Sequence, residues 1–291
     1  MAVSLTFWGT RGSIPTPGAP TSRYGGNTPC VSAMVDQSLV VLDAGSGLRV
    51  LGRELVRHAP SGPLSIDLLL SHTHWDHIQG LPFFAPLFQR GTEVRIYGAQ
   101  QNGTPLDVIL QRQMDPTVFP IPLAALNARL TVTEITEEPL AVGAFVVQVV
   151  SLCHPGRTLG FALAPRAGGP MAAYLTDNEL GAEAAQTARP HLVRFLRGCD
   201  TLVHDAMYFE SERRERAGWG HSSACEAVEL ALEAECRRLV LFHHDPDHDD
   251  ATIDRLLEEA VAHAARAAGG GALIIEAARE GTTLVLEGGS L

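Results

Sequence analysis

The sequence predicts a layered α/β fold, in which β-sheets pack against each other and carry helices on their outer faces. Short apolar strand patterns recur in blocks along the 291 residues, and helical patterns lie between them, mostly in the second half. Apolar residues make up 45% of the chain and charged residues 19%, which is enough apolar material for a sizeable core. Because no low-complexity linker divides the chain, residues 1–291 are expected to form a single domain.

The first part of the chain alternates strand patterns with turn-forming residues. Residues 3–8 predict a strand, and the glycine, proline, serine and threonine residues from Gly9 to Thr28 predict a long structured loop. The next expected elements are a hairpin pair at 30–35 and 38–42, a helix at 46–58 and a largely apolar strand at 64–70.

Strand and helix patterns continue through the remaining residues. Further strands are expected at 93–97, 129–135, 144–151, 160–164, 171–176, 200–204, 238–242, 272–277 and 282–286. Further helices are expected at about 104–113, 181–197, 222–236 and 251–267. Ser222 is the expected cap of the helix that begins there. Phe83, Phe84 and Phe88 follow one another at near-helical spacing and are expected in the core.

The net charge and the cysteines limit the classes of function. The formal net charge is −11 and no long basic run occurs, so extensive nucleic-acid binding is disfavoured. The five cysteines are odd in number and contain no C-x-x-C pair, so no disulfide framework is expected. Residues 1–10 lack a secretory signal and no apolar stretch could span a bilayer, so we expect a cytoplasmic protein without a membrane partner.

A dense group of metal-binding residue types follows the strand that ends at Leu70. Because residues i and i+2 of an extended chain point the same way, His72 and His74 can share one metal ion. Asp76 and His77 lie just beyond them and could serve a second ion. Imidazoles with a carboxylate suit borderline cations such as zinc, manganese or iron. Burying so much polarity without a metal would be costly, so this segment predicts a metal site.

Three more candidate ligands lie just beyond apolar strand patterns. His154 follows VVQVVSLC, Asp177 follows MAAYLT and His243 follows RLVLF. In open α/β sheets, sites form at the edge where the carboxyl ends of the strands meet. A lone histidine at a strand end is more often structural than a ligand, but the dense cluster favours a ligand role for these residues as well.

The segment HTHWDH at 72–77 resembles the metal-binding motif of the metallo-β-lactamase superfamily. Asp43 in LDAGSG resembles the aspartate that precedes this motif in the family. His154, Asp177 and His243 resemble the later ligands, in the expected order. The resemblance covers nearly the whole chain and implies a four-layer αββα sandwich.

The resemblance also implies how the ligands divide between two divalent metal ions. One ion would be held by His72, His74 and His154, the other by Asp76, His77 and His243, with Asp177 as the bridge. Zinc is the favoured metal, with manganese and iron as alternatives. His244 could replace the adjacent His243 as the ligand, but the match of LFHHD to the last motif of the family favours His243.

Two metal ions about 3.5–4 Å apart can bridge a hydroxide and promote in-line attack on phosphorus, so no protein nucleophile is required. Asp76 is expected among the catalytic residues as well as among the ligands. The leaving oxygen benefits from a proton donor, and His221 in GWGHSSA is the candidate, with Asp205 in LVHDAMYF placed to orient it. Alternatively, His221 only begins a helix and Asp205 is a surface carboxylate.

The segments LVHDAMYF and GHSSA are similar to paired motifs of the ribonuclease Z-like branch, which supply an acidic residue and a histidine near the scissile phosphate. The acidic residue of that branch is usually glutamate, which leaves open whether the shorter Asp205 reaches His221. The chain lacks the long tRNA-binding arm and the basic loop of ribonuclease Z, as do the related cyclic-nucleotide phosphodiesterases. The expected function is therefore metal-dependent hydrolysis of a small phosphodiester, such as a cyclic nucleotide.

Three alternative functions stay open. They are a 3′-tRNA-processing endonuclease, a thioester or lactone hydrolase, and a non-catalytic binding module that a metal stabilises. The thioester and lactone branch shares the ligands but has no reason to keep Asp205 with His221. The family resemblance suggests a homodimer. The proline-rich segment 115–122 could be a lid or dimer contact over the site, or a plain connecting loop.

Overall fold

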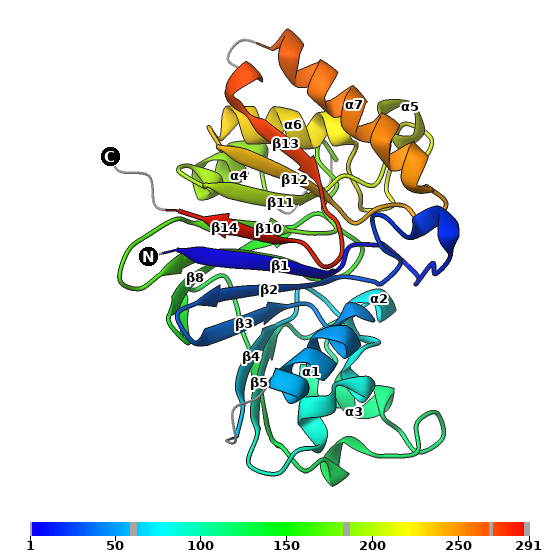
Figure 1. The fold of residues 1–291 in the computed structure, drawn as a ribbon, viewed down its shortest axis with the longest axis vertical. Coiled ribbons are helices and arrows are strands. Elements are labelled where there is room, and N and C mark those ends of the chain that lie inside the picture. The colour runs from blue at the N-terminus through cyan, green and yellow to red at the C-terminus, as the bar shows by residue number, and fades with distance from the viewer. Residues whose placement is uncertain (1, 59–62, 183–186, 268–269, 288–291) are drawn as a thin grey trace.

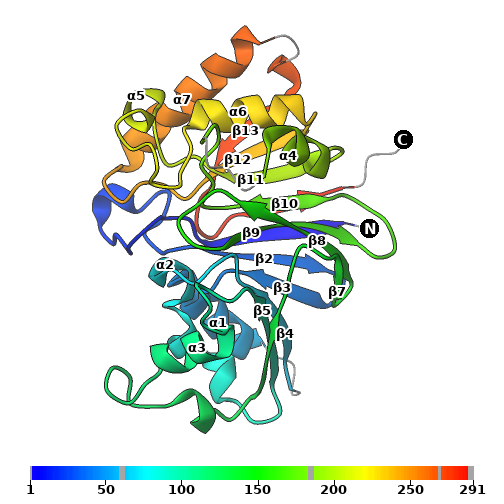
Figure 2. The same cartoon turned by 180° about the vertical axis from the view of Figure 1, so that it is seen from behind.

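The computed structural model, which describes residues 2–58, 63–182, 187–267 and 270–287, contains two β-sheets packed face to face. Helices cover the outer faces of the sheets. Figures 1 and 2 show two groups of helices at opposite ends of the molecule, with the strands between them. The layers therefore run helix, sheet, sheet, helix, and the expected α/β class and four-layer sandwich are confirmed.

The first sheet has seven strands among the described residues, in the order β14-β1-β2-β3-β4-β5-β6. Its members are β1 (Val3–Gly9), β2 (Cys30–Val35), β3 (Ser38–Leu42), β4 (Ser65–Leu69), β5 (Glu93–Gly98), β6 (Arg129–Glu134) and β14 (Thr283–Leu286). Strands β14 to β3 pair antiparallel and strands β3 to β6 pair parallel. Leu5 lies opposite Ala33 and Leu284, so these apolar side chains share the face that meets the second sheet.

The second sheet also has seven described strands, in the order β13-β12-β11-β10-β9-β8-β7. Its members are β7 (Leu140–Val142), β8 (Phe145–Leu152), β9 (Thr158–Pro165), β10 (Ala172–Leu175), β11 (Thr201–Asp205), β12 (Arg238–Phe242) and β13 (Ile274–Ala277). Strands β7 to β10 pair antiparallel, and strands β10 to β13 pair parallel. Strand β10 is therefore the central strand, with three strands on either side.

Each outer helical layer packs through its own apolar core. The α-helices are α1 (Gly47–His58), α2 (Trp75–Ile78), α3 (Leu106–Gln113), α4 (Arg189–Leu196), α5 (Glu210–Arg213), α6 (Ala224–Glu233) and α7 (Asp250–Arg266). Short 3-10 turns lie at η1 (Ala19–Thr21), η2 (Leu81–Phe83), η3 (Ala85–Phe88), η4 (Leu123–Ala125) and η5 (Gly270–Ala272). Leu48 of α1 and Leu106 of α3 pack on the first sheet, whereas Val228 of α6 and Leu256 of α7 pack on the second.

The strands follow the sequence patterns closely, but some helices do not. The helix expected at 181–197 begins only at Arg189, where Pro190 occupies the first turn, a position at which proline favours helix initiation. Residues 183–186 of that expected helix lie outside the described residues. The short elements α2, α5 and β7 were not expected, because three or four residues are too few to show a periodic pattern.

The expected cap at Ser222 is wrong by one residue. Ser223 caps α6: its hydroxyl accepts a hydrogen bond from the Glu226 backbone N–H (3.2 Å), while the Glu226 carboxylate accepts one from the Ser223 N–H (2.8 Å). Ser222 is buried instead, and its hydroxyl donates to the Asn178 carbonyl (2.5 Å) and accepts from the Leu180 N–H (3.0 Å). Ser222 therefore ties α6 to the loop that follows β10.

The expectation that all three phenylalanines after the metal motif are core residues is wrong for Phe83. Phe84 is buried and Phe88 packs against the same core, but Phe83 is 56% exposed. The segment forms two 3-10 turns rather than one α-helix, so the neighbours Phe83 and Phe84 point to different sides. The Phe83 ring meets the Phe119 ring at a centroid distance of 5.5 Å, within the expected lid or loop segment 115–122.

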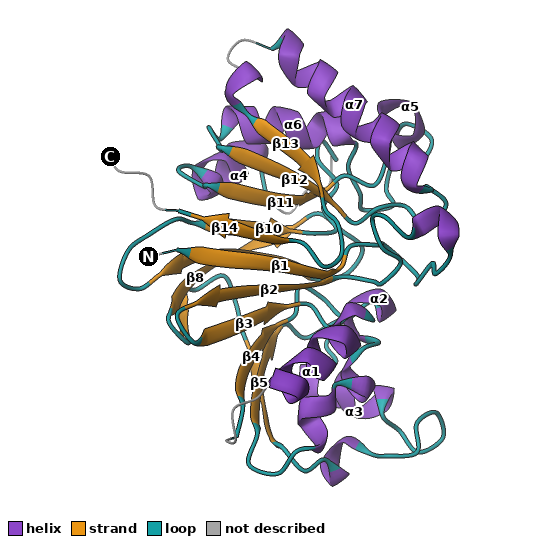
Figure 3. Cartoon of the chain, viewed as in Figure 1, coloured by secondary structure: helices purple, strands orange, loops and turns teal. Residues whose placement is uncertain are grey.

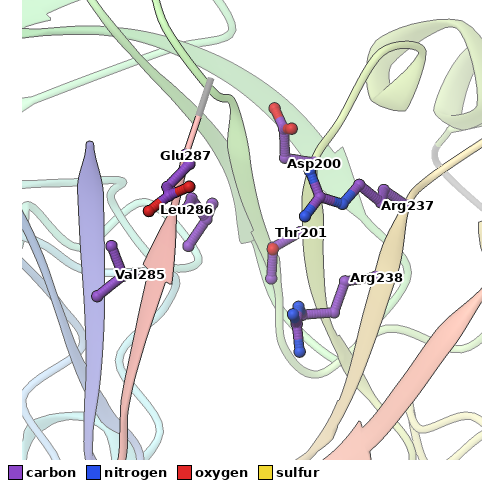
Figure 4. Close-up of a pocket in the computed structure, with 7 residues that line it drawn as sticks. All are labelled: Asp200, Thr201, Arg237, Arg238, Val285, Leu286 and Glu287. Atoms are coloured by element: carbon purple, nitrogen blue, oxygen red, sulfur yellow. The ribbon is translucent and has the colours of Figure 1, made fainter. Parts of the chain in front are cut away.

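The carboxyl ends of β4, β8, β10, β11 and β12 meet at one edge of the sandwich, and Figure 3 shows loops gathered at that edge beside α2. At the opposite edge, Asp200, Arg237 and Arg238 line a cavity of about 10 Å³ with residues 285–287 (Figure 4). That volume admits at most about one water molecule. The first edge is therefore the place to look for chemistry.

Two expectations about the whole chain can be compared with the described residues. None of their helices combines the length and the apolar composition that a membrane crossing requires. No disulfide bond joins the cysteines, as the odd count and the spacing predicted.

The opposite environments of Phe83 and Phe84 predict opposite effects on stability. Phe84→Ala should lower the free energy of unfolding by about 3–5 kcal/mol, because it empties a filled core position. Phe83→Ala, its matched surface control, should change that free energy by no more than about 0.5 kcal/mol. Urea unfolding followed by circular dichroism measures both. Equal losses in the two variants would contradict the packing described.

Candidate metal centre

All seven predicted metal ligands lie together at the loop-rich edge, in two groups. Within each group the candidate ligand atoms lie within 4.8 Å of one another. The first group comprises His72, His74 and His154, and the second comprises Asp76, His77, Asp177 and His243. The division between the two groups follows the one that the family resemblance implied.

Asp177 lies between the two groups and faces both. Its Oδ1 lies 3.1 Å from His77 Nε2 and 3.2 Å from His243 Nε2, in the second group. Its Oδ2 lies 3.7 Å from His72 Nε2 and 3.6 Å from His154 Nε2, in the first group. One carboxylate therefore presents a different oxygen to each group, the arrangement that a bridging ligand requires.

The ring nitrogens that point away from the centre have their own partners. His72 Nδ1 lies 3.0 Å from the Ser71 hydroxyl, and His77 Nδ1 lies 2.8 Å from Asp43 Oδ2. His154 Nδ1 donates to the Gly220 carbonyl at 2.9 Å. Such outer partners fix the orientation and tautomer of a ligating imidazole. In all three rings Nε2 is thereby left to face the centre.

The remaining inward atoms fit divalent cations. Nε2 of His72 and Nε2 of His77 are buried and have no hydrogen-bond partner, which is costly for a polar atom. His74 Nδ1 and His154 Nε2 lie 3.0 Å apart. Two nitrogen ligands of one tetrahedral zinc ion would lie about 3.3 Å apart, close to this spacing. The donor set of imidazoles and carboxylates suits zinc and similar cations.

Burial and neighbouring charges set the protonation of the candidate ligands. Burial holds the pKa of His72 well below its usual range and lowers the pKa of His154 to about 4, so both imidazoles are neutral and can donate a lone pair. Burial opposes ionisation of Asp177, but His243 and His77 lower its pKa well below its usual range. An ionised carboxylate among neutral imidazoles is the form that binds a cation.

The choice between the adjacent residues His243 and His244 follows from where their rings point. His243 Nε2 lies 3.2 Å from Asp76 Oδ2 and 3.2 Å from Asp177 Oδ1, so it belongs to the second group. His244 is buried on the other side of the chain, where its Nε2 bonds to the Ala278 carbonyl at 2.9 Å. The ring placement thus favours His243, in agreement with the sequence prediction.

Asp43 supports this centre from beneath. Its Oδ2 accepts hydrogen bonds from the Ser71 hydroxyl and the Tyr174 hydroxyl, both at 2.8 Å, and also faces His77 Nδ1. Its Oδ1 accepts from the Ser71 N–H at 2.7 Å. Asp43 is completely buried, so these contacts hold the start of the 72–77 motif in place. Ser71 and Tyr174 carry no pattern in the sequence that could have indicated this role.

His221 and Asp205 form a pair beside both groups. His221 Nδ1 lies 2.6 Å from Asp205 Oδ2, so the aspartate does reach the histidine that the sequence left open. The His221 ring stacks on His243 at a centroid distance of 5.0 Å and meets His154 edge-on at 5.0 Å. Burial lowers the pKa of His221, but the Asp205 carboxylate outweighs burial and raises it to about 9.

Glu179, which the sequence analysis missed, holds the loop that carries His221. It is buried, and its Oε1 accepts hydrogen bonds from Arg213 Nη2 (2.9 Å) and the Gly218 N–H (2.8 Å), while its Oε2 accepts from the Gly220 N–H (2.8 Å). The only hint in the sequence is its position two residues after Asp177. Glu179 thereby links the bridging ligand to the loop of the proton-donor candidate.

Gly220 is required where this loop meets the ligands. Its φ of +87° lies in the region that favours glycine, and a Cβ there would lie 2.1 Å from His154 Nδ1. The absence of a side chain lets the Gly220 carbonyl approach close enough to bind that nitrogen.

The long loop at 9–28 closes the other side of the centre. The Ser13 N–H donates to Asp76 Oδ2 at 2.8 Å. Arg11 is completely buried and donates to the carbonyls of Gly25, Asp245 and His248, which fastens this loop to the segment after His243. The loop is thus a structured turn, as expected, and it also contacts a ligand.

Comparison with known proteins relates the chain to one large family. A family model described as the beta-lactamase superfamily domain matches residues 39–244. Ribonuclease Z of Picrophilus torridus is 24% identical over 288 residues, covering 88% of this chain and 89% of that protein. Two solved structures share the fold. A diphosphatase of the PhnP family has a TM-score of 0.68 at 20% identity, covering 99% of this chain and 98% of its own. The short form of human tRNase Z has a TM-score of 0.64 at 19% identity, covering 97% and 98%.

The adjacent histidines provide a matched test of the second ligand group. His243→Gln should reduce the zinc content of the purified protein, because it removes an inward ligand atom. His244→Gln should leave the zinc content unchanged, although it disturbs a buried hydrogen bond. Inductively coupled plasma mass spectrometry measures zinc per chain. Loss of zinc in His244→Gln alone would reverse the assignment.

The contact between Asp43 and His77 predicts an effect on affinity without loss of a ligand. Asp43→Asn should weaken zinc binding by about 10–100-fold, because the imidazole loses its carboxylate partner. Asp67→Asn is the control, since Asp67 is also buried but pairs with Arg95 on the first sheet. Chelator competition yields both affinities. Similar zinc affinities in the wild type and Asp43→Asn would rule out this supporting role.

Proposed function

The chain belongs to the metallo-β-lactamase superfamily, in its ribonuclease Z-like branch of metal-dependent hydrolases, and we propose that it is a phosphodiesterase that hydrolyses a small diester such as a cyclic nucleotide. The observation that carries this proposal is the 2.6 Å contact between His221 and Asp205 beside both ligand groups. Hydrolysis of a thioester or lactone gives no reason for such a pair.

In this proposal the two ligand groups each hold one divalent cation, with zinc favoured over manganese and iron. When bound, the two cations would supply Lewis-acid activation of water and stabilise negative charge on the phosphoryl oxygens. Asp177 serves both groups because its two oxygens face different histidines. Asp76 is fixed by the Ser13 N–H, so it contributes to the second group in one orientation.

His221 supplies the proton that the leaving oxygen needs. Asp205 accepts from Nδ1, which leaves Nε2 of His221 to donate toward the reacting group. The carboxylate also favours the protonated imidazole, as the raised pKa of His221 indicates. Asp205 is itself fixed by the backbone N–H groups of Met207 and Ser222, both at 3.2 Å, so the histidine is held in one direction.

A second candidate function is cleavage of precursor tRNA, which the likeness to ribonuclease Z supports over 88% of the chain. The net charge of −11 favours the small diester, because binding of a long polyanion depends on many basic contacts. A gel assay with precursor tRNA discriminates between the two candidates. The small-diester proposal expects little or no cleavage under conditions that hydrolyse a cyclic nucleotide.

The role of His221 predicts a loss of turnover with the metals retained. With zinc or manganese the protein should hydrolyse bis-(p-nitrophenyl) phosphate, and His221→Ala should lower kcat by about 10²–10⁴-fold at an unchanged metal content. The loss should be greater for a cyclic nucleotide, since its alkoxide leaving group needs a proton more than nitrophenolate does. His263→Ala is the control, because His263 lies on α7 and pairs only with Glu229 among the printed ion pairs of that helix face. Normal turnover in His221→Ala would remove this residue from the mechanism.

A further inference from the structure

The two ligand groups differ in their access to solvent. All four residues of the second group are buried, whereas in the first group His74 is exposed and His154 is half-buried. Substrate must therefore approach the centre from the side of His74 and His154.

Two tryptophans border this opening. Trp75 directly follows His74 and begins α2, which lies at the loop-rich edge in Figure 3. Trp219 precedes Gly220, whose carbonyl binds His154 Nδ1. Because His74 Nδ1 and His154 Nε2 lie 3.0 Å apart, the two tryptophans flank one pair of ligands from two different loops.

Both indole rings are exposed to an unusual degree. Trp75 is 79% exposed and Trp219 is 61% exposed, whereas Trp8 is half-buried and donates its Nε1–H to the Ser32 hydroxyl at 2.9 Å. A large aromatic side chain is normally buried, because it contributes more apolar area to a core than most residues do. Two exposed indoles at the mouth of one site therefore call for a bound partner.

The charge of the protein indicates what kind of partner this is. At a net charge of −11, the protein does not attract an anionic substrate through its overall field. A stacked aromatic face adds affinity without charge, and every nucleobase presents such a face. A nucleobase linked to the reacting phosphate would lie near the opening while the phosphate occupies the ligand groups.

We propose that Trp75 and Trp219 stack against the nucleobase of the substrate and thereby select nucleotide diesters over diesters that lack an aromatic base. This inference rests on the proposed function, since it places the phosphate of the same substrate at the metal centre. Ile14 adds apolar surface next to this opening: it is 59% exposed and follows Ser13, which binds Asp76.

Tryptophan fluorescence of the metal-loaded protein tests this contact without any turnover. Adenosine 5′-monophosphate should quench the emission, and ribose 5-phosphate, which offers the same phosphate without a base, should not. Trp75→Leu and Trp219→Leu should each weaken nucleotide binding about fivefold or more, the range known for loss of one base-stacking residue. Trp8→Phe is the matched control and should keep both the quenching and the affinity.

Three results would overturn the inference. They are equal quenching by the two ligands, unchanged affinity in both leucine variants, and a wild-type dimer that Trp75→Leu or Trp219→Leu converts to a monomer in analytical ultracentrifugation. The last result would mean that the indoles form a contact between two copies of the chain. Hydrolysis of bis-(p-nitrophenyl) phosphate is measured in parallel. Quenching without hydrolysis would leave the stacking contact intact and defeat the proposed function, whereas hydrolysis without quenching would do the reverse.

Discussion

One buried carboxylate, that of Asp177, sets the geometry on which the rest of the site depends. It is 2% exposed and its two oxygens face histidines of different groups, so its charge must be balanced from both sides. The fold meets this requirement through strand order. Asp177 follows β10, the central strand of the second sheet, while His154 follows β8 and His243 follows β12, each two strands away. The ligands therefore approach Asp177 from opposite directions along one sheet edge.

The same edge holds its side chains in unusual backbone conformations. Asp43, Asp177 and His243 all have positive φ values, of 61°, 50° and 61°. Residues without glycine's freedom rarely adopt this conformation, and it persists where the surrounding structure imposes it. Here each residue lies just after a strand, and the sharp turn directs its side chain across the end of the sheet. Stability is thus given up locally for the direction of three functional groups.

Sequence reasoning was sufficient for residues whose role follows from position along a strand. His72 and His74 alternate just after β4, and His154, Asp177 and His243 each follow an apolar strand, so their meeting at one edge follows from sheet geometry. Roles that depend on contacts between distant loops could not be predicted in this way.

Glu179 illustrates what the sequence could not show. Its importance lies in amide groups nearly forty residues later, at Gly218 and Gly220, and no local pattern records that contact. Phe83 was misplaced for a related reason, because helical spacing says nothing about 3-10 turns that send adjacent rings to opposite sides. The exposure of Trp75 likewise follows from the turn that begins α2 between two ligands.

The central claim is that Asp177 bridges two cations held by two separate ligand groups. Anomalous diffraction at the zinc edge, from crystals grown with zinc, tests this claim most directly. The account predicts two peaks about 3.5–4 Å apart, one beside His72, His74 and His154 and the other beside Asp76, His77 and His243. A single peak, or a second peak remote from Asp177, would contradict it.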